Sequence, residues 1–425
     1  MSKNFTKELE ELTKAEIISE DTAEKIRNYY QTKQNNSSTV LVAFAIIGAI
    51  LVGLGFILII AHNWDNLSRP TKVVFAFMPL ILAQLLCGFS LLKKQEQSVW
   101  VESTSILLFF AVGASISLVS QIYNIQGNLS AFLFIWGLLC LPIIYLMRSY
   151  AASLLYICVI TYYAVESNYT WSFLMNKENI HYWWMFLLVV PNYVINFKKL
   201  PHSNAIRIHN WIIPISLTIA LSTLSHRGED FLYMAYLSLF GIFYALGNAS
   251  VYSQSKRRGN GFLVLGSLGT ISLLLTLSFN WFWERSLNIK NIYDLEFIAA
   301  MLTSLAALAL TGWQLNKKNN NGIILIKFAF AIYIALYTIS NFYPYTSQIL
   351  TNVLILSIGV NLILNGTKED HLGLINYGML VITSLIICRF FDSNISFIMR
   401  GLLFIAVGAG FFVANYLILK RRKQK

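Results

Sequence analysis

The sequence predicts an all-α protein, a polytopic bundle of transmembrane helices, and three observations support this fold class. Of the 425 residues, 56% are hydrophobic and only 12% are charged, whereas about a quarter of the residues in soluble domains are charged. The mean hydropathy is +0.59. Long apolar runs alternate with short polar loops from Thr39 onward. Such a chain must bury its apolar surface in lipid.

The apolar runs predict about 14 membrane spans, because about 20 apolar residues in a helix cross the hydrocarbon core of a bilayer. We expect the spans at 39–61, 71–92, 101–122, 129–147, 149–166, 182–197, 210–225, 230–250, 260–281, 294–315, 322–341, 347–366, 372–390 and 396–418. No loop exceeds about 15 residues, which leaves no room for a catalytic domain outside the membrane. The sequence also contains no Walker A, HExxH or GxSxG motif, so it predicts no bound cofactor.

Residues 1–38 form a polar segment before the bundle of residues 39–419, and residues 420–425 form a basic cytoplasmic tail. Apolar residues recur at helical spacing, and Ser19-Glu20-Asp21 is typical of a helix start, so the segment predicts a cytoplasmic helical hairpin. This hairpin is either a motif that binds a protein partner or an amphipathic tail at the membrane surface. The first span is too long for a secretory signal and predicts a retained signal anchor.

The distribution of Lys and Arg predicts the orientation in the membrane. With the N-terminus inside, 23 of the 32 basic residues fall on inward segments and 8 on outward segments, and Lys327 falls within a span. This bias is the one that the positive-inside rule requires, so both termini are expected in the cytoplasm. It also explains the net charge of +12 without a nucleic-acid partner.

The four cysteines, Cys87, Cys140, Cys158 and Cys388, lie inside or at the edges of apolar runs. They show no CxxC spacing and have no neighbouring His, which a metal site would need. Small buried hydrophobic residues are therefore the better interpretation.

Polar residues gather on the predicted outward face and form the candidate binding site. The expected set is His62, Trp64, Asp65, Arg69, Gln121, Tyr123, Arg389, Asp392 and Arg400. Charge counting predicts only their common depth, and says nothing about their lateral proximity.

Two alternatives remain open for this set. Arg400 lies inside the last span, where a charged residue usually faces protein or a water-filled cavity. In the first alternative Arg400 forms an internal ion pair with Asp392, and Arg389 competes with it for this carboxylate. In the second, Arg400 and Arg389 together form a subsite for a carboxylate or phosphate. His62 and Asp65 suggest a proton relay, half of a metal site or, more simply, a capped helix end; no third ligand is near them, so no metal is predicted.

Other charged residues near the membrane have simple explanations. Lys327 lies about six residues into a span that begins inside, and its side chain can snorkel to the cytoplasmic interface. The acids Glu102, Glu166, Asp294 and Glu296 fall at span ends, where water is close. The paucity of acids deep in the spans argues against a proton pump.

Several short motifs carry a family resemblance. They are the N-terminal helical pair ending near Tyr30, the first span leading into His62-Asn63-Trp64-Asp65, the Gln121-Ile122-Tyr123 loop, and Arg389-Phe390-Phe391-Asp392 followed by Arg400-Gly401. In this order they resemble the bacterial predicted membrane proteins of domain of unknown function family 2157. The resemblance implies a bacterial inner-membrane protein and implies no activity.

Three function classes fit these features. The leading one is a transporter or flippase-like protein for an anionic solute or lipid headgroup, with the outward polar set as its site. The second is a membrane scaffold or sensor that acts through residues 1–38. The third, an intramembrane enzyme with His62 as base and Asp65 as orienting residue, fits least because the loops are short and no second acid is near.

Overall fold

The computed structural model describes only part of the chain. The described residues are 9, 11–15, 17–26, 64–170, 180–224, 229–249, 252, 259–283, 295–316, 322–340, 342–392, 398, 401, 402, 405, 408–410 and 412. The chain divides into two compact units, Met1–Ala76 and Phe77–Lys425. Within the described residues the regular structure is helical and includes no strands.

The described N-terminal residues of the first unit form two short helical stretches. Ser19 begins the second stretch, because its Oγ atom accepts a hydrogen bond from the Thr22 amide at 3.3 Å, as in a helix N-cap. Leu9 and Ala23, one from each stretch, are buried. Residues 27–63 lie outside the described part, so the complete hairpin and its boundary at residue 38 stay predictions.

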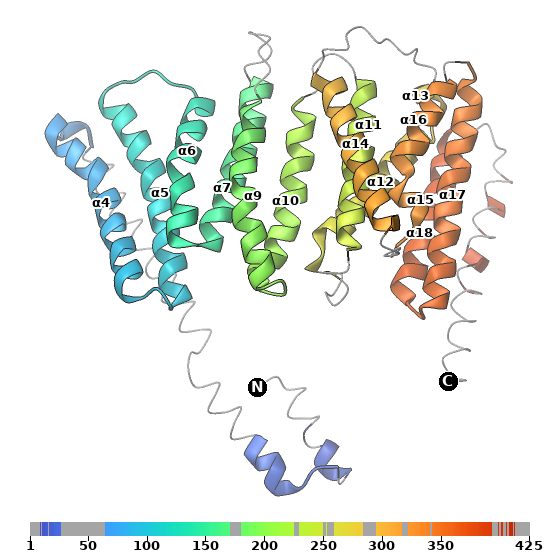
Figure 1. Ribbon diagram of the computed structural model, residues 1–425, viewed down its shortest axis with the longest axis horizontal. Helices are drawn as coiled ribbons and strands as arrows, with labels where there is room; N and C mark the ends of the chain where they lie inside the picture. The colour runs from blue at the N-terminus through green and yellow to red at the C-terminus, as the bar shows by residue number, and fades with distance from the viewer. Residues whose placement is uncertain are drawn as a thin grey trace. The chain divides into compact units, whose positions relative to one another are not determined.

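The remaining helices follow one another with short connections (Figure 1). Their bounds are η1 Trp64–Asn66, α4 Arg69–Lys93, α5 Ser98–Ile122, α6 Leu129–Met147, α7 Tyr150–Val165, the π-helical η2 Glu166–Thr170, α9 His181–Lys199, α10 Asn204–Ser222, α11 Glu229–Gly247, α12 Gly261–Leu277, α13 Asn280–Trp283, α14 Leu295–Asn316, α15 Ile324–Lys327, α16 Ala329–Ser340, α17 Pro344–Lys368 and α18 Leu372–Asp392. Each span predicted between residues 71 and 390 overlaps one of these helices.

Eight helices in the described part are long and apolar enough to cross a membrane, and three more apolar helices are shorter. The shorter ones are Phe231–Gly247, Gly261–Leu277 and Ala329–Ser340. The predicted span 39–61 and most of 396–418 lie outside the described residues. The all-helical, multi-pass architecture is therefore confirmed, whereas the count of about 14 spans stays a prediction.

Glycines allow the closest helix pairs of the second unit to approach. A Cβ atom added to Gly266 of α12 would lie 2.4 Å from the Tyr244 amide nitrogen of α11. One added to Gly378 of α18 would lie 2.7 Å from the Gly359 carbonyl oxygen of α17. Such contacts between backbones are typical of membrane helices, which pack through small residues.

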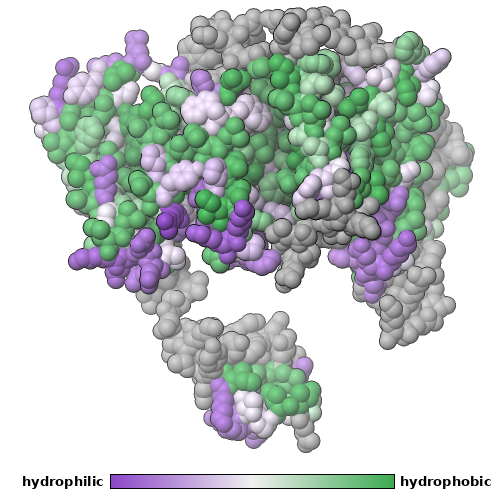
Figure 2. Space-filling model, in the orientation of Figure 1, coloured by the Kyte–Doolittle hydropathy of each residue, from purple (hydrophilic) through white to green (hydrophobic). Residues whose placement is uncertain are grey.

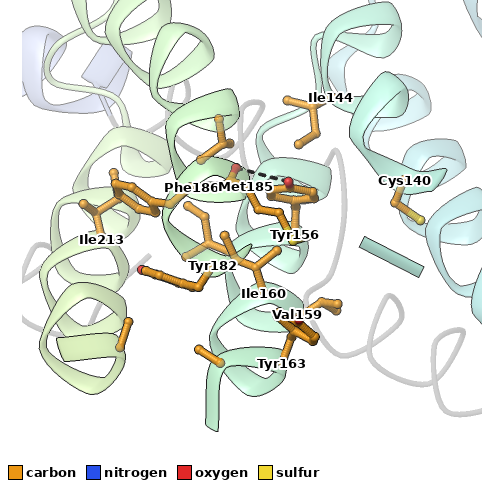
Figure 3. Packing of buried hydrophobic residues seen from close by; sticks show 14 of the residues in the cluster. Cys140, Ile144, Tyr156, Val159, Ile160, Tyr163, Tyr182, Met185, Phe186 and Ile213 are labelled. Carbon is orange, nitrogen blue, oxygen red and sulfur yellow. Dashed lines mark hydrogen bonds between the residues drawn. The ribbon is translucent and has the colours of Figure 1, made fainter. Parts of the chain in front are cut away.

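Two large clusters of buried apolar side chains hold the second unit together. The first is centred on α6, α7, α9 and α10 and includes residues from α4, α5, α11, α12 and α14, and Figure 3 shows Tyr156, Ile160, Tyr182 and Met185 within it. The Tyr156 hydroxyl in this cluster donates a hydrogen bond to the Met185 carbonyl at 3.1 Å. The second cluster contains residues from each of the helices α11 to α18. α11 contributes to both clusters and so connects them.

Large apolar side chains also cover the outside of the second unit. Leu85, Leu146 and Leu187 are each about two-thirds exposed, and Figure 2 shows hydrophobic residues in a broad band across the helices. In water such a band would be an unusually large apolar patch. In a bilayer it faces the lipid chains.

The two ends of the helices differ in charge. The turns 94–97, 148–149, 200–203 and 369–371 lie at the lower end in Figure 1. In or beside them are Lys93, Lys94, Arg148, Lys198, Lys199, Arg207 and Lys368. The turns 123–128 and 342–343 lie at the upper end and contain no Lys or Arg.

Candidate functional site

The first unit carries part of the predicted outward set. Arg69 begins α4 and is exposed, and Asp65 lies in η1. The Lys72 ammonium lies 5.6 Å from the centre of the Trp64 ring, within the range of a cation–π contact. His62 lies outside the described residues, so the proposed pairing of His62 with Asp65 stays a prediction.

The second unit carries the rest of the set on helices that pack in different places. Gln121 and Tyr123 end α5 and are exposed, and α5 packs against α6 and α7. Arg389 lies in α18, which packs against α17 and α12. The structure therefore does not bring Gln121 and Arg389 together. Asp392 ends α18, and Arg400 lies outside the described residues.

Arg389 is held at the junction of α12, α13 and α18. Its Nη2 atom donates to the Ser278 Oγ atom at 3.2 Å, and its guanidinium lies 5.3 Å from the centre of the Phe279 ring. The Ser278 hydroxyl donates its own proton to the Leu275 carbonyl at 2.6 Å, which leaves its lone pairs for the arginine. These contacts fix where the positive charge lies.

A polar cluster that sequence analysis did not predict lies at the lower end of α5, α7 and α10. The Glu102 carboxylate accepts hydrogen bonds from Ser149 Oγ at 2.5 Å, from the Tyr150 amide at 3.0 Å and from the Ala151 amide at 2.9 Å. These amides are at the start of α7, where backbone N–H groups have no partner within the helix. Glu102 thus ties α5 to the positive end of the α7 dipole.

His209 continues this cluster from α10. Its Nδ1 atom lies 2.9 Å from the Ala205 carbonyl oxygen, and its Nε2 atom lies 3.1 Å from Ser153 Oγ. Because a carbonyl oxygen can only accept, Nδ1 carries the proton and Nε2 of the neutral ring accepts from Ser153. The pairing resembles the activation of a serine nucleophile. Ser153 is completely buried, however, so a substrate cannot reach it and the pairing is structural.

Hydroxyl and amide groups extend the cluster toward the turn after α11. The Tyr193 hydroxyl donates to Asn210 Oδ1 at 2.7 Å and lies 3.2 Å from the Tyr252 hydroxyl. The Asn210 amide donates in turn to the Gly259 carbonyl at 3.3 Å. Burial raises the pKa of the Tyr252 phenol, so this group stays a neutral donor in the network.

Lys327 is the most unusual charged residue that the structure describes. It ends the short helix α15, beside α11, α16 and α17, and only 2% of it is exposed. The expected snorkelling would leave the ammonium at the surface, so this placement corrects that expectation. The Lys327 Nζ atom is not among the buried side-chain atoms that lack a hydrogen-bond partner in the described part of the chain. Taking a charge largely out of water is unfavourable all the same.

Side-chain amides bind the backbone at the end of α11. The Gln314 Nε2 atom donates to the Ala245 carbonyl at 2.7 Å, and the Asn260 amide donates to the Gly247 carbonyl at 2.7 Å. The Tyr244 hydroxyl accepts from the Ile323 amide at 2.9 Å, just before α15. Gln314 Oε1 is buried and has no hydrogen-bond partner within the described part of the chain.

Sequence analysis missed these residues because their contacts join parts of the chain that are far apart. Ser149 and Ser153 are four residues apart and share a helix face, which suggests a polar contact, but nothing local points to His209, which lies 56 residues after Ser153. Lys327 was predicted to snorkel to the cytoplasmic interface, and its burial depends in part on α11, which is distant in the chain. No group of three or more potential metal ligands occurs among the described residues.

Comparison with known proteins finds a family match for the N-terminal third of the chain. Residues 10–153, roughly one third of the chain, match the model of a family described as a predicted membrane protein (DUF2157). This confirms, over these residues, the family that the motifs resemble. The matched part contains Trp64, Arg69, Gln121 and Tyr123, whereas Arg389 lies outside it. No curated protein and no solved structure matches the chain.

Proposed function

We propose that this multi-pass membrane protein is a bacterial inner-membrane transporter or flippase-like protein for an anionic solute or lipid headgroup. The observation that carries the proposal is the burial of Lys327, the one Lys or Arg in the described part of the bundle that is buried. Ionisable residues within membrane spans usually mark substrate or ion pathways. A bound anion would balance this charge.

The orientation proposed for this function follows from the charged turns. The lower end in Figure 1, which carries the basic turns, faces the cytoplasm by the positive-inside rule. Both chain termini are then cytoplasmic. In this orientation Lys327 lies in the cytoplasmic part of its span, and Arg389 lies near the outward face.

The two cations belong to one group of helices. α15, which ends at Lys327, and α18, which carries Arg389, both pack against α17. An anion that moves between them would cross the second apolar cluster, whose members Ile271, Ile355 and Phe330 are almost completely buried. The proposed movement therefore requires these helices to separate. The other outward residues remain proposed contacts at its outer end.

The direct test is flux through the purified full-length chain in liposomes. We expect uptake of radiolabelled glycolate or movement of a fluorescent phosphatidylglycerol between leaflets, and its loss in a Lys327→Met variant. The matched control is Lys368→Met, because Lys368 is an exposed basic residue at the end of α17. Flux that is equal in Lys327→Met and the wild type would refute the role of Lys327.

A second candidate function rests on the N-terminal segment. Leu12 and Ile17 are apolar but are 39% and 68% exposed, as expected of a surface that binds a protein partner or the membrane. In this alternative the bundle only anchors a scaffold or sensor. Deletion of residues 1–36 separates the two: a transporter would keep its flux, whereas a scaffold would lose its cellular function while the bundle still folds.

A further inference from the structure

We infer that the ends of α9 and α10 at the turn 200–203 bind the headgroup of an anionic phospholipid. Three exposed basic residues form the surface, which we call the α9–α10 basic surface. They are Lys198 and Lys199 at the end of α9 and Arg207 in the first turn of α10. They lie on other helices than the two cations of the proposed path, so the inference does not rest on the proposed function.

Contacts between α9 and α10 bring these charges to one place. The Tyr193 hydroxyl of α9 donates to Asn210 Oδ1 of α10 at 2.7 Å. Lys199 follows Tyr193 by six residues, and Arg207 precedes Asn210 by three. At a rise of about 1.5 Å per residue, both cations lie on the turn side of this contact within about 9 Å of it along the helices. Arg207 also donates to Asn204 Oδ1, which holds its guanidinium beside the turn.

No carboxylate neutralises these charges within the described part of the chain. None of the three basic side chains forms an ion pair there. The sequence contains no Asp or Glu from 179 to 228 or from 248 to 260. The second range matters because Gly259 lies against α10, where a Cβ atom added to it would lie 2.7 Å from Arg207 Cδ. Neither segment therefore supplies a counter-charge.

The other basic turns at the same end of the helices differ in this respect. Each has an acid in or beside it, namely Glu96 in 94–97, Glu102 beside 148–149 and Glu369 in 369–371. The positive-inside rule accounts for basic residues at all of these turns. It does not account for the absence of acids from one of them. The α9–α10 basic surface is therefore the one among them that attracts an anion most strongly.

Exposed apolar side chains lie one helical turn deeper on the same faces of α9. Val194 and Ile195 precede Lys198 and Lys199 by four residues, and positions four apart share a helix face. Val194 is 39% exposed and Ile195 is 49% exposed. A phospholipid can place its phosphate at the lysines and its acyl chains along these apolar residues, whereas a soluble anion would use the cations alone. The surface thus fits a lipid.

The charge of the headgroup follows from the donors. Lys and Arg offer only N–H donors, and phosphate oxygens are acceptors. A zwitterionic headgroup adds an ammonium that the three cations repel. Three basic residues at a membrane surface together favour an anionic lipid over a neutral one by a factor on the order of 100.

The test measures lipid binding to the full-length protein in neutral detergent by native mass spectrometry. The probes are phosphatidylglycerol and phosphatidylcholine with identical acyl chains. We expect a preference for phosphatidylglycerol on the order of 100-fold, and inorganic phosphate at the same concentration should not displace it. Equal binding of the two lipids would overturn the inference. Displacement by inorganic phosphate would overturn the lipid as the occupant.

Two variants assign the preference to this surface. The double variant Lys198→Gln and Lys199→Gln should lower the preference by about tenfold or more. Its matched control is Lys93→Gln and Lys94→Gln, which removes the same charge at the end of α4, where Glu96 is close in the chain. The control should keep the preference of the wild type. Equal losses in both double variants would mean that net charge alone attracts the lipid, and the inference would be wrong.

A second measurement uses the wild-type chain and so does not depend on the folding of a variant. Phosphatidylglycerol and phosphatidylcholine, each with the same photoreactive group in an acyl chain, are crosslinked to the protein in liposomes. The labelled peptides are then identified by mass spectrometry. The ratio of labelling by the anionic lipid to labelling by the zwitterionic one should be highest at residues 194–208. A uniform ratio along the chain would exclude a lipid site at this turn.

Discussion

Glu102 Oε2 lies 2.5 Å from Ser149 Oγ, and through this contact the carboxylate of α5 holds the first turn of α7. Ser149 also accepts from the Ala152 amide at 3.1 Å and so caps the same helix. Arg148, just before it, has a left-handed backbone with φ of 53°. The tight turn between α6 and α7 is therefore fixed by a residue 47 positions away in the chain.

Replacing Glu102 should loosen this turn. We expect Glu102→Gln to lower the free energy of unfolding by about 1–3 kcal/mol, because the charged acceptor of two backbone amides and a hydroxyl is lost. The measurement is thermal unfolding in detergent, with Glu96→Gln as the control at an exposed position in the preceding turn. Equal melting temperatures for both variants would show that the contact contributes nothing.

Lys327 should destabilise the empty protein. In Lys327→Met the buried charge is replaced by an apolar side chain of similar length, and we expect stability to rise by about 1 kcal/mol or more. Lys368→Met, at the exposed end of α17, should leave stability nearly unchanged. If Lys327→Met instead unfolds at a lower temperature, Lys327 has a stabilising partner and its role in the proposed site must be abandoned.

The sequence predicted the helices well and the contacts among them poorly. The spans at 129–147 and 372–390 follow from local apolar runs, which lipid enforces directly, and both coincide with α6 and α18. The contact between Arg389 and Ser278 joins residues 111 positions apart. Hydropathy predicts depth in the membrane and carries no information on which helices are neighbours, so the lateral arrangement of the candidate site could not be predicted.

Gly266 should tolerate no side chain. We expect Gly266→Ala to destabilise the protein by about 1–3 kcal/mol, because the new Cβ atom would overlap the backbone of α11 at Tyr244, which cannot move aside. Gly312→Ala is the matched control, since a Cβ atom there meets nothing within 4 Å. The control should be neutral or slightly stabilising. Comparable losses in both variants would mean that α11 and α12 do not pack this closely.

Accessibility labelling should show which end of the helices faces the cytoplasm. In a variant without the four native cysteines, a single cysteine replaces either Glu96, in the basic turn after α4, or Gln126, in the turn after α5 that has no Lys or Arg. We expect a membrane-impermeant maleimide to label the Gln126→Cys variant in intact spheroplasts. The Glu96→Cys variant should react only after the membrane is opened, because basic turns remain in the cytoplasm. The opposite pattern would place Lys327 near the outer face and Arg389 near the inner one, and would reverse the proposed path.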